Sequence, residues 1–197
     1  MVTLDDVRTA LDVHQPRVVT LRDCQAAAVA LVLRAAADGP QMLFIERAER
    51  DGDPWSGHMA FPGGRVDPGD CDPRAAAERE TLEETGVDVR AGQPLGRLHD
   101  LEGRGGQPGL VVSAFVYAVP GVEGLRPNYE VREALWVPVR ALLDPARQVT
   151  YPYPRGGNSH FPAILVGNER QIVWGLTYRF IEIFFEALGR PLGRAAW

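Results

Sequence analysis

Residues 63–70 read Gly-Gly-Arg-Val-Asp-Pro-Gly-Asp and residues 79–87 read Arg-Glu-Thr-Leu-Glu-Glu-Thr-Gly-Val, and these two stretches decide the fold. The first stretch is rich in glycine and proline, which is typical of a tight turn whose backbone can approach a ligand closely. The second stretch carries Glu80, Glu83 and Glu84 at helical spacing. Together they predict a glycine-rich turn that leads into a short acidic helix.

The helix is expected to begin after Asp72 and to end before Gly86. Asp72 is a good N-cap, and Pro73 suits the first helical position because an N–H there would be unpaired in any case. Gly86 readily adopts the left-handed conformation that ends many helices. At about 100° per residue, the three glutamates span roughly a 100° arc. We therefore expect them to face a cleft, while Ala75 and Leu82 point the opposite way, toward the core.

Three carboxylates that lie close together repel one another, which makes a helix less stable. A hard cation such as Mg²⁺ or Mn²⁺ removes that penalty, because oxygen atoms are its preferred ligands. The alternative interpretation is an acidic helix face that is simply solvated. Gly63 and Gly64 favour the metal site, since an unshielded carbonyl oxygen there can join the ligands. The pattern predicts a metal-dependent hydrolase of phosphoanhydride bonds.

The two stretches together resemble the signature of the Nudix hydrolases. Asp70 stands where that signature usually has Glu, and Thr81 occupies a usually aliphatic position. Eight residues separate Asp70 from Arg79, one more than is usual. Phe-Pro-Gly-Gly-Arg-Val-Asp-Pro-Gly-Asp at 61–70, with this longer spacing, is similar to the coenzyme A diphosphatase branch. The resemblance implies an α/β fold, a Nudix-type α/β/α sandwich with a mixed β-sheet.

The resemblance also implies roles for single residues. Glu80, Glu83 and Glu84 resemble the catalytic glutamates and metal ligands, with the Gly64 carbonyl as a backbone ligand and Mg²⁺ or Mn²⁺ as the cofactor. Glu83 is preferred as a general base acting through a water. Arg79 and Asp70 resemble an internal salt bridge that braces the loop against the helix.

Three further residues are candidate substrate contacts. Arg47 begins the segment before the glycines, where the coenzyme A branch usually carries a second pattern. In the loop at 151–162, Tyr153 is suited to stack on an adenine, and Arg155 to pair with a phosphate. The alternative is that this loop only packs on the flank of the domain. For Glu130 and Glu133 the sequence leaves two roles open: each either lies near the metal or is a charge on the protein surface.

Composition limits the class of protein. A chain of 197 residues with 45% hydrophobic content predicts one domain over 1–197, with a helical extension at 1–22 and a C-terminal loop and helix at 146–197 packing on the core. The formal charge of −5 argues against a nucleic-acid binder. The apolar runs are too short to span a bilayer, and no secretory signal is recognisable. We expect a cytoplasmic protein with no membrane partner.

The remaining pattern predicts the other elements. A capping box at Thr3 opens a helix that runs to about His14. The last helix should end near 188–189, and its apolar residues favour core packing or a homodimer contact. Strands are expected over 26–34, 42–47, 58–61, 87–90, 95–101 and 110–119, with a hairpin joining the first two and a short helix over 139–143.

Three functions follow as hypotheses. The leading one is hydrolysis of coenzyme A or its derivatives to 3′,5′-ADP and 4′-phosphopantetheine, as the resemblance implies. The second is the same chemistry on another small-molecule nucleotide, such as ADP-ribose, a dinucleotide or a nucleoside triphosphate. Ala48 and the missing His in the second pattern keep this alternative open. The third is a nucleotide-binding Nudix module without turnover.

Overall fold

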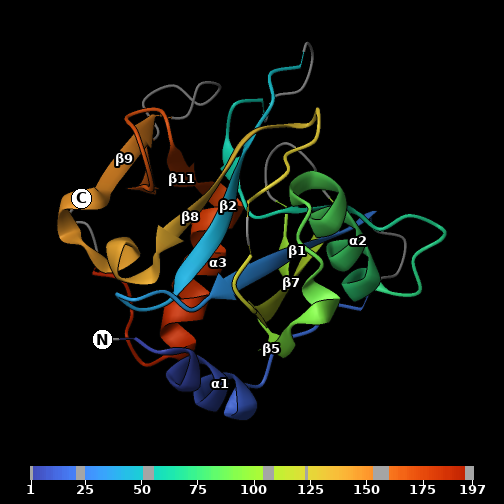
Figure 1. Cartoon of the computed structure of the whole chain (residues 1–197), viewed down its shortest axis with the longest axis horizontal. Helices are drawn as coiled ribbons and strands as arrows, with labels where there is room; N and C mark the ends of the chain where they lie inside the picture. Colours follow the sequence, from blue (N-terminus) through green and yellow to red (C-terminus); the bar gives the residue numbers. More distant parts are fainter. Residues whose placement is uncertain are drawn as a thin grey trace.

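A mixed β-sheet forms the centre of the protein (Figure 1). The computed structural model describes residues 2–20, 25–50, 56–103, 109–122, 124–152 and 160–193. The central strands of this sheet, β1 and β7, run parallel, and the other pairings are antiparallel. The path is β3 (Met59–Ala60), β2 (Gln41–Arg47), β1 (Gln25–Arg34), β7 (Leu110–Val119) and β5 (Gln93–Arg97). In addition, β4 (Gly63–Arg65) pairs with β1, β6 (Leu101–Glu102) with β7, and β8 (Val131–Pro138) with β2.

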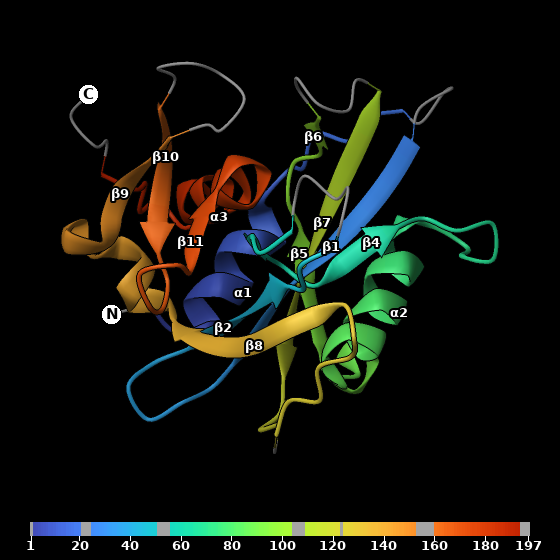
Figure 2. The same cartoon turned by 90° about the horizontal axis from the view of Figure 1, so that it is seen from above.

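Helices cover both faces of this sheet. Figure 2 shows α2 (Pro73–Thr85) on one side of β1 and β7, and α1 (Leu4–Val13) and α3 (Gly175–Ala187) on the other. Strand β1 alternates accordingly, because Ala28, Ala30 and Val32 pack with α2 while Leu31 and Leu33 belong to the core beneath α1 and α3. The predicted α/β/α sandwich with a mixed sheet is confirmed.

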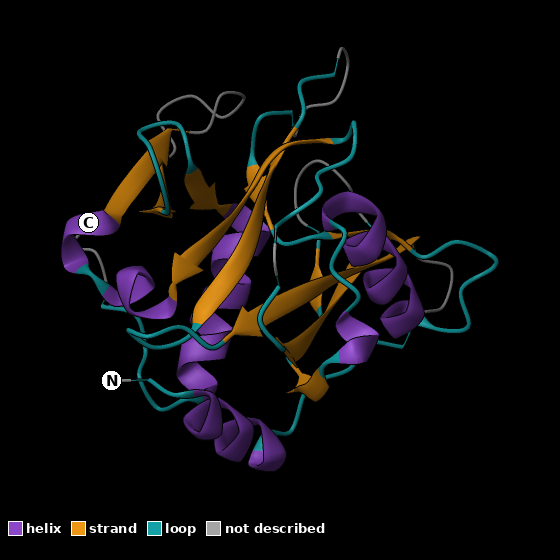
Figure 3. Ribbon diagram, viewed as in Figure 1, coloured by secondary structure: helices purple, strands orange, loops and turns teal. Residues whose placement is uncertain are grey.

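The C-terminal region contains a second sheet where we expected only a loop and a helix. Strands β9 (Gln148–Pro152), β10 (His160–Leu165) and β11 (Ile172–Trp174) form an antiparallel sheet that lies beside the main one (Figure 3). Trp174 is mostly buried, and its ring stacks on Tyr151 with centroids 4.7 Å apart. His58, just before β3, meets the same indole edge-on at 5.1 Å. This aromatic contact joins the small sheet to the main one.

Several expected elements are confirmed. Thr3 forms a capping box with Asp6, and α1 ends at Val13. The hairpin of β1 and β2 is present, and residues 139–143 form a short helix of the 3₁₀ type. Helix α3 ends at Ala187, and its apolar side chains fill the core of this same chain.

Two of the predicted strands differ from the structure. Residues 87–90 form no strand, because Asp88 caps a 3₁₀ turn over Val89–Ala91. The strand expected over 95–101 is divided into β5 and β6, and Asp100 between them accepts hydrogen bonds from Val19 N and Arg97. The Asp100 backbone N–H in turn donates to Arg17 O, so at this position the chain bonds to the N-terminal segment and not to β7.

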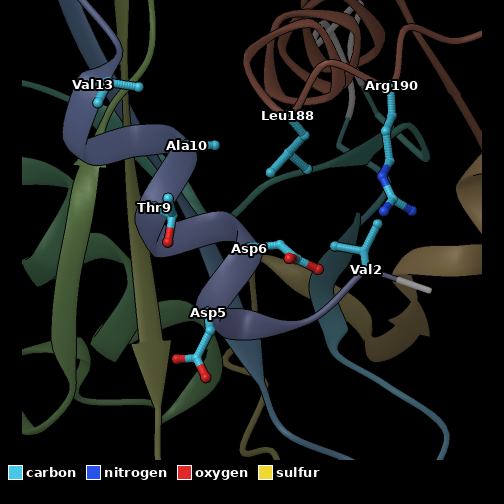
Figure 4. A pocket seen from close by; sticks show the side chains of 8 residues that line it. All are labelled: Val2, Asp5, Asp6, Thr9, Ala10, Val13, Leu188 and Arg190. Carbon is cyan, nitrogen blue, oxygen red and sulfur yellow. The ribbon is translucent and has the colours of Figure 1, made fainter.

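A surface pocket of about 380 Å³ lies between α1 and the residues that follow α3 (Figure 4). It is lined by Val2, Asp5, Asp6, Thr9, Ala10, Val13, Leu188 and Arg190. None of these residues comes from α2 or from the glycine-rich turn, so the pocket is separate from the acidic helix. In the described parts of the chain, no helix is long and apolar enough to cross a membrane.

Candidate active site

Helix α2 begins and ends at the residues the sequence predicts. The Asp72 side chain accepts a hydrogen bond from Ala75 N at 2.8 Å, and Pro73 occupies the first turn. Gly86 has a φ of 75°, and its N–H donates to Leu82 O. Both ends of the acidic helix are therefore fixed by its own sequence.

The face that α2 buries differs from our expectation. Leu82 is 37% exposed, whereas Thr81 and Glu84 are buried. Small side chains at Ala76 and Ala77 let the helix lie close to the sheet, so the leucine is not needed in the contact. Thr81, at the usually aliphatic position, donates to Ala77 O at 2.6 Å and so satisfies its hydroxyl within the helix. The correction places one glutamate on the core side of the helix rather than in a solvent-facing row.

The glycine pair is held against β1 as strand β4. Gly63 pairs with Val29 at a φ of 150°, and a Cβ there would collide with the Ala28 carbonyl oxygen. Gly64 follows, and a Cβ on it would collide with the carboxylate of Glu80. Gly63 is therefore required by the backbone approach, while Gly64 leaves room for a carboxylate.

Arg79 connects the turn to the helix. Its Nε and Nη2 donate to the two carboxylate oxygens of Asp70 at 3.1 and 3.0 Å, and Nη2 also donates to Arg65 O at 3.3 Å. The guanidinium lowers the pKa of Asp70 below its usual value. Nη1 donates to Glu80 at 2.9 Å. This two-pronged contact braces the loop against α2, as the resemblance implied.

Three carboxylates from two separate segments meet beside Gly64. Glu80, Glu84 and Glu130 each offer an oxygen, and these oxygens lie within 4.8 Å of one another. We call these three residues the acidic triad. Two of them come from α2, and Glu130 comes from the residues just before β8.

Glu84 is the most buried member of the triad. It is 3% exposed, and Gly63 N donates to its carboxylate at 2.8 Å. Burial is the main cause that raises its pKa to about 8, and the charge of Glu80 adds to the effect. Burial also raises the pKa of Glu80, against the opposing effect of Arg79. The triad thus concentrates more negative charge than its surroundings neutralise.

The loop before β8 brings Glu130 to α2 through backbone contacts. Arg126 N donates to Thr85 O at 2.8 Å, and Asn128 N donates to Glu84 O at 3.4 Å. Of the two acids left open by the sequence, Glu130 therefore reaches the triad. Glu133 instead accepts a hydrogen bond from the buried Gln171 amide at 2.8 Å.

The other predicted site residues are placed as follows. The Glu83 side chain is 53% exposed and lies 3.4 Å from Arg79, outside the triad. Arg47 ends β2, and its charge lowers the pKa of Glu84, so it lies within electrostatic range of the triad. Tyr153 and Arg155 fall outside the described residues, and their roles stay predictions.

One residue was missed by the sequence reasoning. Arg50 donates from Nη2 to Glu130 at 2.7 Å, and its guanidinium lies over the Tyr129 ring, 5.1 Å from the centroid. It belongs to the segment before the glycines, in which the sequence pattern indicates only Arg47 as a substrate contact. Its position next to Glu130 depends on the fold, because the two residues are 80 positions apart.

The triad fits a hard divalent cation. Its donors are all carboxylate oxygens, and Glu84 is a buried acid whose charged form the protein alone stabilises poorly. Glu80, Glu84 and Glu130 would hold such an ion, and the backbone of Gly64 lies against the Glu80 carboxylate.

Comparisons with known proteins agree with this geometry. A NUDIX domain model matches residues 25–154. The chain belongs to the Nudix family. Nudix proteins hydrolyse phosphoanhydride bonds of small nucleotides, generally with a divalent metal, so this Nudix protein is a hydrolase of that class.

Two of the relatives that the chain matches are described as coenzyme A diphosphatases. This Nudix protein is 33% identical over 173 residues to the mitochondrial coenzyme A diphosphatase NUDT8 of Mus musculus, covering 85% of this chain and 80% of that protein. For the Homo sapiens protein of the same name the identity is 34%, with 85% and 72% covered. An uncharacterised protein of Schizosaccharomyces pombe is 39% identical, and the match spans 75% of this chain but only 47% of that longer protein.

Solved structures support the fold alone. A MutT/nudix family protein from Enterococcus faecalis superposes with a TM-score of 0.58 at 18% identity, covering 95% of this chain and 70% of the other. A MutT protein from Methanosarcina mazei Go1 gives 0.51 at 23% identity, covering 84% and 93%.

Proposed function

We propose that this Nudix hydrolase cleaves the diphosphate linkage of coenzyme A or its derivatives, giving 3′,5′-ADP and 4′-phosphopantetheine. The observation that carries the proposal is the acidic triad beside Gly64 in a chain whose 61–70 stretch and whose Asp70–Arg79 spacing resemble the coenzyme A branch. Similarity to the two mammalian coenzyme A diphosphatases over 85% of the chain supports it.

The residues of the site would divide the work. Glu80, Glu84 and Glu130, with the Gly64 carbonyl, hold Mg²⁺ or Mn²⁺, which when bound draws charge from phosphate oxygens and acidifies water. Glu83 is proposed as the general base acting through a water, since it lies on α2 with Glu80 and Glu84 and its carboxylate is exposed. Arg79 holds the carboxylates of Glu80 and Asp70 in position by hydrogen bonds. The reaction requires no covalent intermediate.

The remaining parts of the proposal concern the substrate contacts and the state of the protein. Arg47, Tyr153 and Arg155 stay part of the proposal as substrate contacts, as do one domain over 1–197, a cytoplasmic location and a homodimer.

A second candidate is another nucleoside diphosphate derivative. It is favoured by the segment before Gly63, which has Ala48 in place of Ser and lacks the usual His. A substrate panel with Mg²⁺ and with Mn²⁺, products identified by mass, separates the two. Release of 3′,5′-ADP from coenzyme A at the highest kcat/KM supports the proposal. Faster release of AMP from ADP-ribose or a dinucleotide would replace it.

A further inference from the structure

Among the described residues, Arg50 is the one ion-pair partner of Glu130, and this pairing is the least buried one within the acidic triad. The distance from Arg50 Nη2 to Glu130 Oε1 is 2.7 Å. The two side chains are 44% and 33% exposed, so both are accessible to solvent. A carboxylate of the proposed metal site is therefore occupied by an arginine from the segment before the glycines.

The three carboxylates have donors of different mobility. Glu80 is paired with Arg79, which is itself fixed by both oxygens of Asp70. Glu84 accepts from the backbone N–H of Gly63, which belongs to β4. Neither donor can leave without breaking the brace or the strand. Among the described residues, the Arg50 guanidinium contacts only the Glu130 carboxylate and the Tyr129 ring, and neither contact fixes it in this way.

The backbone of Arg50 is nevertheless held in place. Ser56 Oγ accepts from Arg50 N at 2.9 Å and lies 3.0 Å from Arg50 O, to which it donates. Tyr129, 81% exposed, offers the face of its ring to the guanidinium. Arg50 thus combines a fixed main chain with a long side chain that can swing over an aromatic platform.

A divalent cation bound by the triad changes the partner that suits Arg50. The ion would satisfy Glu130 and would repel a guanidinium at contact distance. A diphosphate on the same ion presents oxygens that match the planar fork of arginine. Both changes favour movement of the guanidinium from Glu130 to the substrate.

We propose that Arg50 pairs with Glu130 in the metal-free enzyme and exchanges this carboxylate for a phosphate oxygen of the diphosphate when metal and substrate bind. The exchange rests on the proposed function, because it needs a metal at the triad and a diphosphate beside it. It makes Arg50 a substrate-binding residue that also opposes metal entry.

The first test measures metal binding without turnover. Mn²⁺ dissociation constants of the metal-free protein are obtained by electron paramagnetic resonance for the wild type, Arg50→Ala and Arg179→Ala. Arg179 is a matched control, since it is 48% exposed and pairs with Glu182 on α3. Loss of a competing surface ion pair should tighten Mn²⁺ binding by about two- to fivefold in Arg50→Ala and leave Arg179→Ala unchanged.

A double-mutant cycle locates this effect. In a Glu130→Gln background, Arg50→Ala should no longer tighten Mn²⁺ binding, because the carboxylate for which they compete is gone. Unchanged or weaker Mn²⁺ binding in Arg50→Ala, with an unchanged melting temperature, overturns the exchange.

The second test measures substrate binding at saturating Mn²⁺. Arg50→Ala should raise KM for the best substrate roughly ten- to hundredfold, as expected when a charged hydrogen bond to phosphate is lost, and Arg50→Lys should recover part of it. An unchanged KM overturns the exchange. If the wild type binds Mn²⁺ but hydrolyses no diphosphate, only the proposed function fails; the same comparison is then made with the dissociation constant of a methylene-bridged ADP analogue.

Discussion

Two groups of carboxylates lie in this molecule, and they are treated in opposite ways. Glu46 and Glu133 are register partners on β2 and β8, and the buried amide of Gln171 donates to both of them at 3.2 and 2.8 Å. We call these two the bridged pair. Arg132 adds an ion pair to Glu46 at 3.2 Å. In the acidic triad, by contrast, the donors each serve a single member, and burial raises the pKa of Glu84 to about 8.

The difference separates structure from function. A buried acid is costly unless a donor or a cation compensates it. In the bridged pair only Glu46 is buried, whereas Glu133 is exposed. Gln171 and Arg132 compensate the Glu46 carboxylate, and Gln171 also connects the small sheet to the main one, so the pair stabilises the fold. In the triad the protein does not fully compensate the carboxylate charge, and a bound cation would do so.

The largest expected effect follows from neutralising one acid in each group. Glu84→Gln keeps the oxygen that accepts from Gly63 but removes the charge, and should lower kcat/KM by more than the roughly 10- to 100-fold that loss of an outer-shell partner costs. Glu133→Gln should leave kcat/KM unchanged. Equal losses in the two variants, both folded by circular dichroism, would contradict the contrast.

The next effect concerns the two glycines. Gly64→Ala pushes a Cβ against the Glu80 carboxylate, whose flexible end can move, so Mn²⁺ binding should weaken about tenfold with little change in melting temperature. In Gly63→Ala the Cβ meets the Ala28 carbonyl oxygen at a positive φ, so the stability should fall by about 2 kcal/mol or more. Calorimetry and Mn²⁺ titration of both variants distinguish the roles; reversed results would show that Gly64 is the structural glycine.

The raised pKa of Glu84 predicts a pH dependence. Metal binds the carboxylate form, so below the pKa of about 8 a proton must be displaced, and Mn²⁺ affinity should rise by up to about tenfold per pH unit between about pH 6 and 8. Above that range the affinity should level off.

The same pKa has the opposite effect on the stability of the metal-free protein. The folded state holds a proton that the unfolded chain, with its value of 4.5, releases, so stability should decline as the pH rises from about 5 to 8. Glu84→Gln should abolish this part of the decline. Urea unfolding at several pH values in chelator measures it, and an identical slope in wild type and variant would contradict the assignment to Glu84.

The smallest effect is expected at the bridged pair. Gln171→Met keeps the volume but removes the amide shared by Glu46 and Glu133, and should cost about 1–3 kcal/mol of unfolding free energy. The kcat at saturating metal should be retained. An unchanged unfolding free energy would contradict the stabilising role of the amide. Lost turnover in a folded variant would show that the pair belongs to the active site.

The sequence predicted those features that depend on neighbouring residues. The ends of α2 follow from Asp72, Pro73 and Gly86, which act within one helical turn, and the hairpin of β1 and β2 from a local turn. The prediction of which face α2 buries was wrong, because alanines and Thr81 let the helix approach the sheet more closely than a leucine would. Helical spacing alone does not decide between such faces.

The third carboxylate and the small sheet depend on distant contacts. Glu130 reaches the triad because backbone N–H groups at 126 and 128 donate to the end of α2, and nothing in the local pattern distinguishes Glu130 from Glu133. Strands β9 and β10 each contain a proline, which weakens the strand signal in the sequence. The family resemblance predicted the roles of the glutamates on α2, whereas the position of Arg50 next to Glu130 could be seen only in the folded structure.

The most direct measurement is the anomalous diffraction of a crystal grown with Mn²⁺. A metal at the triad should give a peak within coordination distance of carboxylate oxygens of Glu80 and Glu84, with Glu130 or the Gly64 carbonyl beside it. The bridged pair should show no peak. Ordered Mn²⁺ between Glu46 and Glu133, or a triad without metal at a concentration that supports turnover, would contradict the assignment of the site.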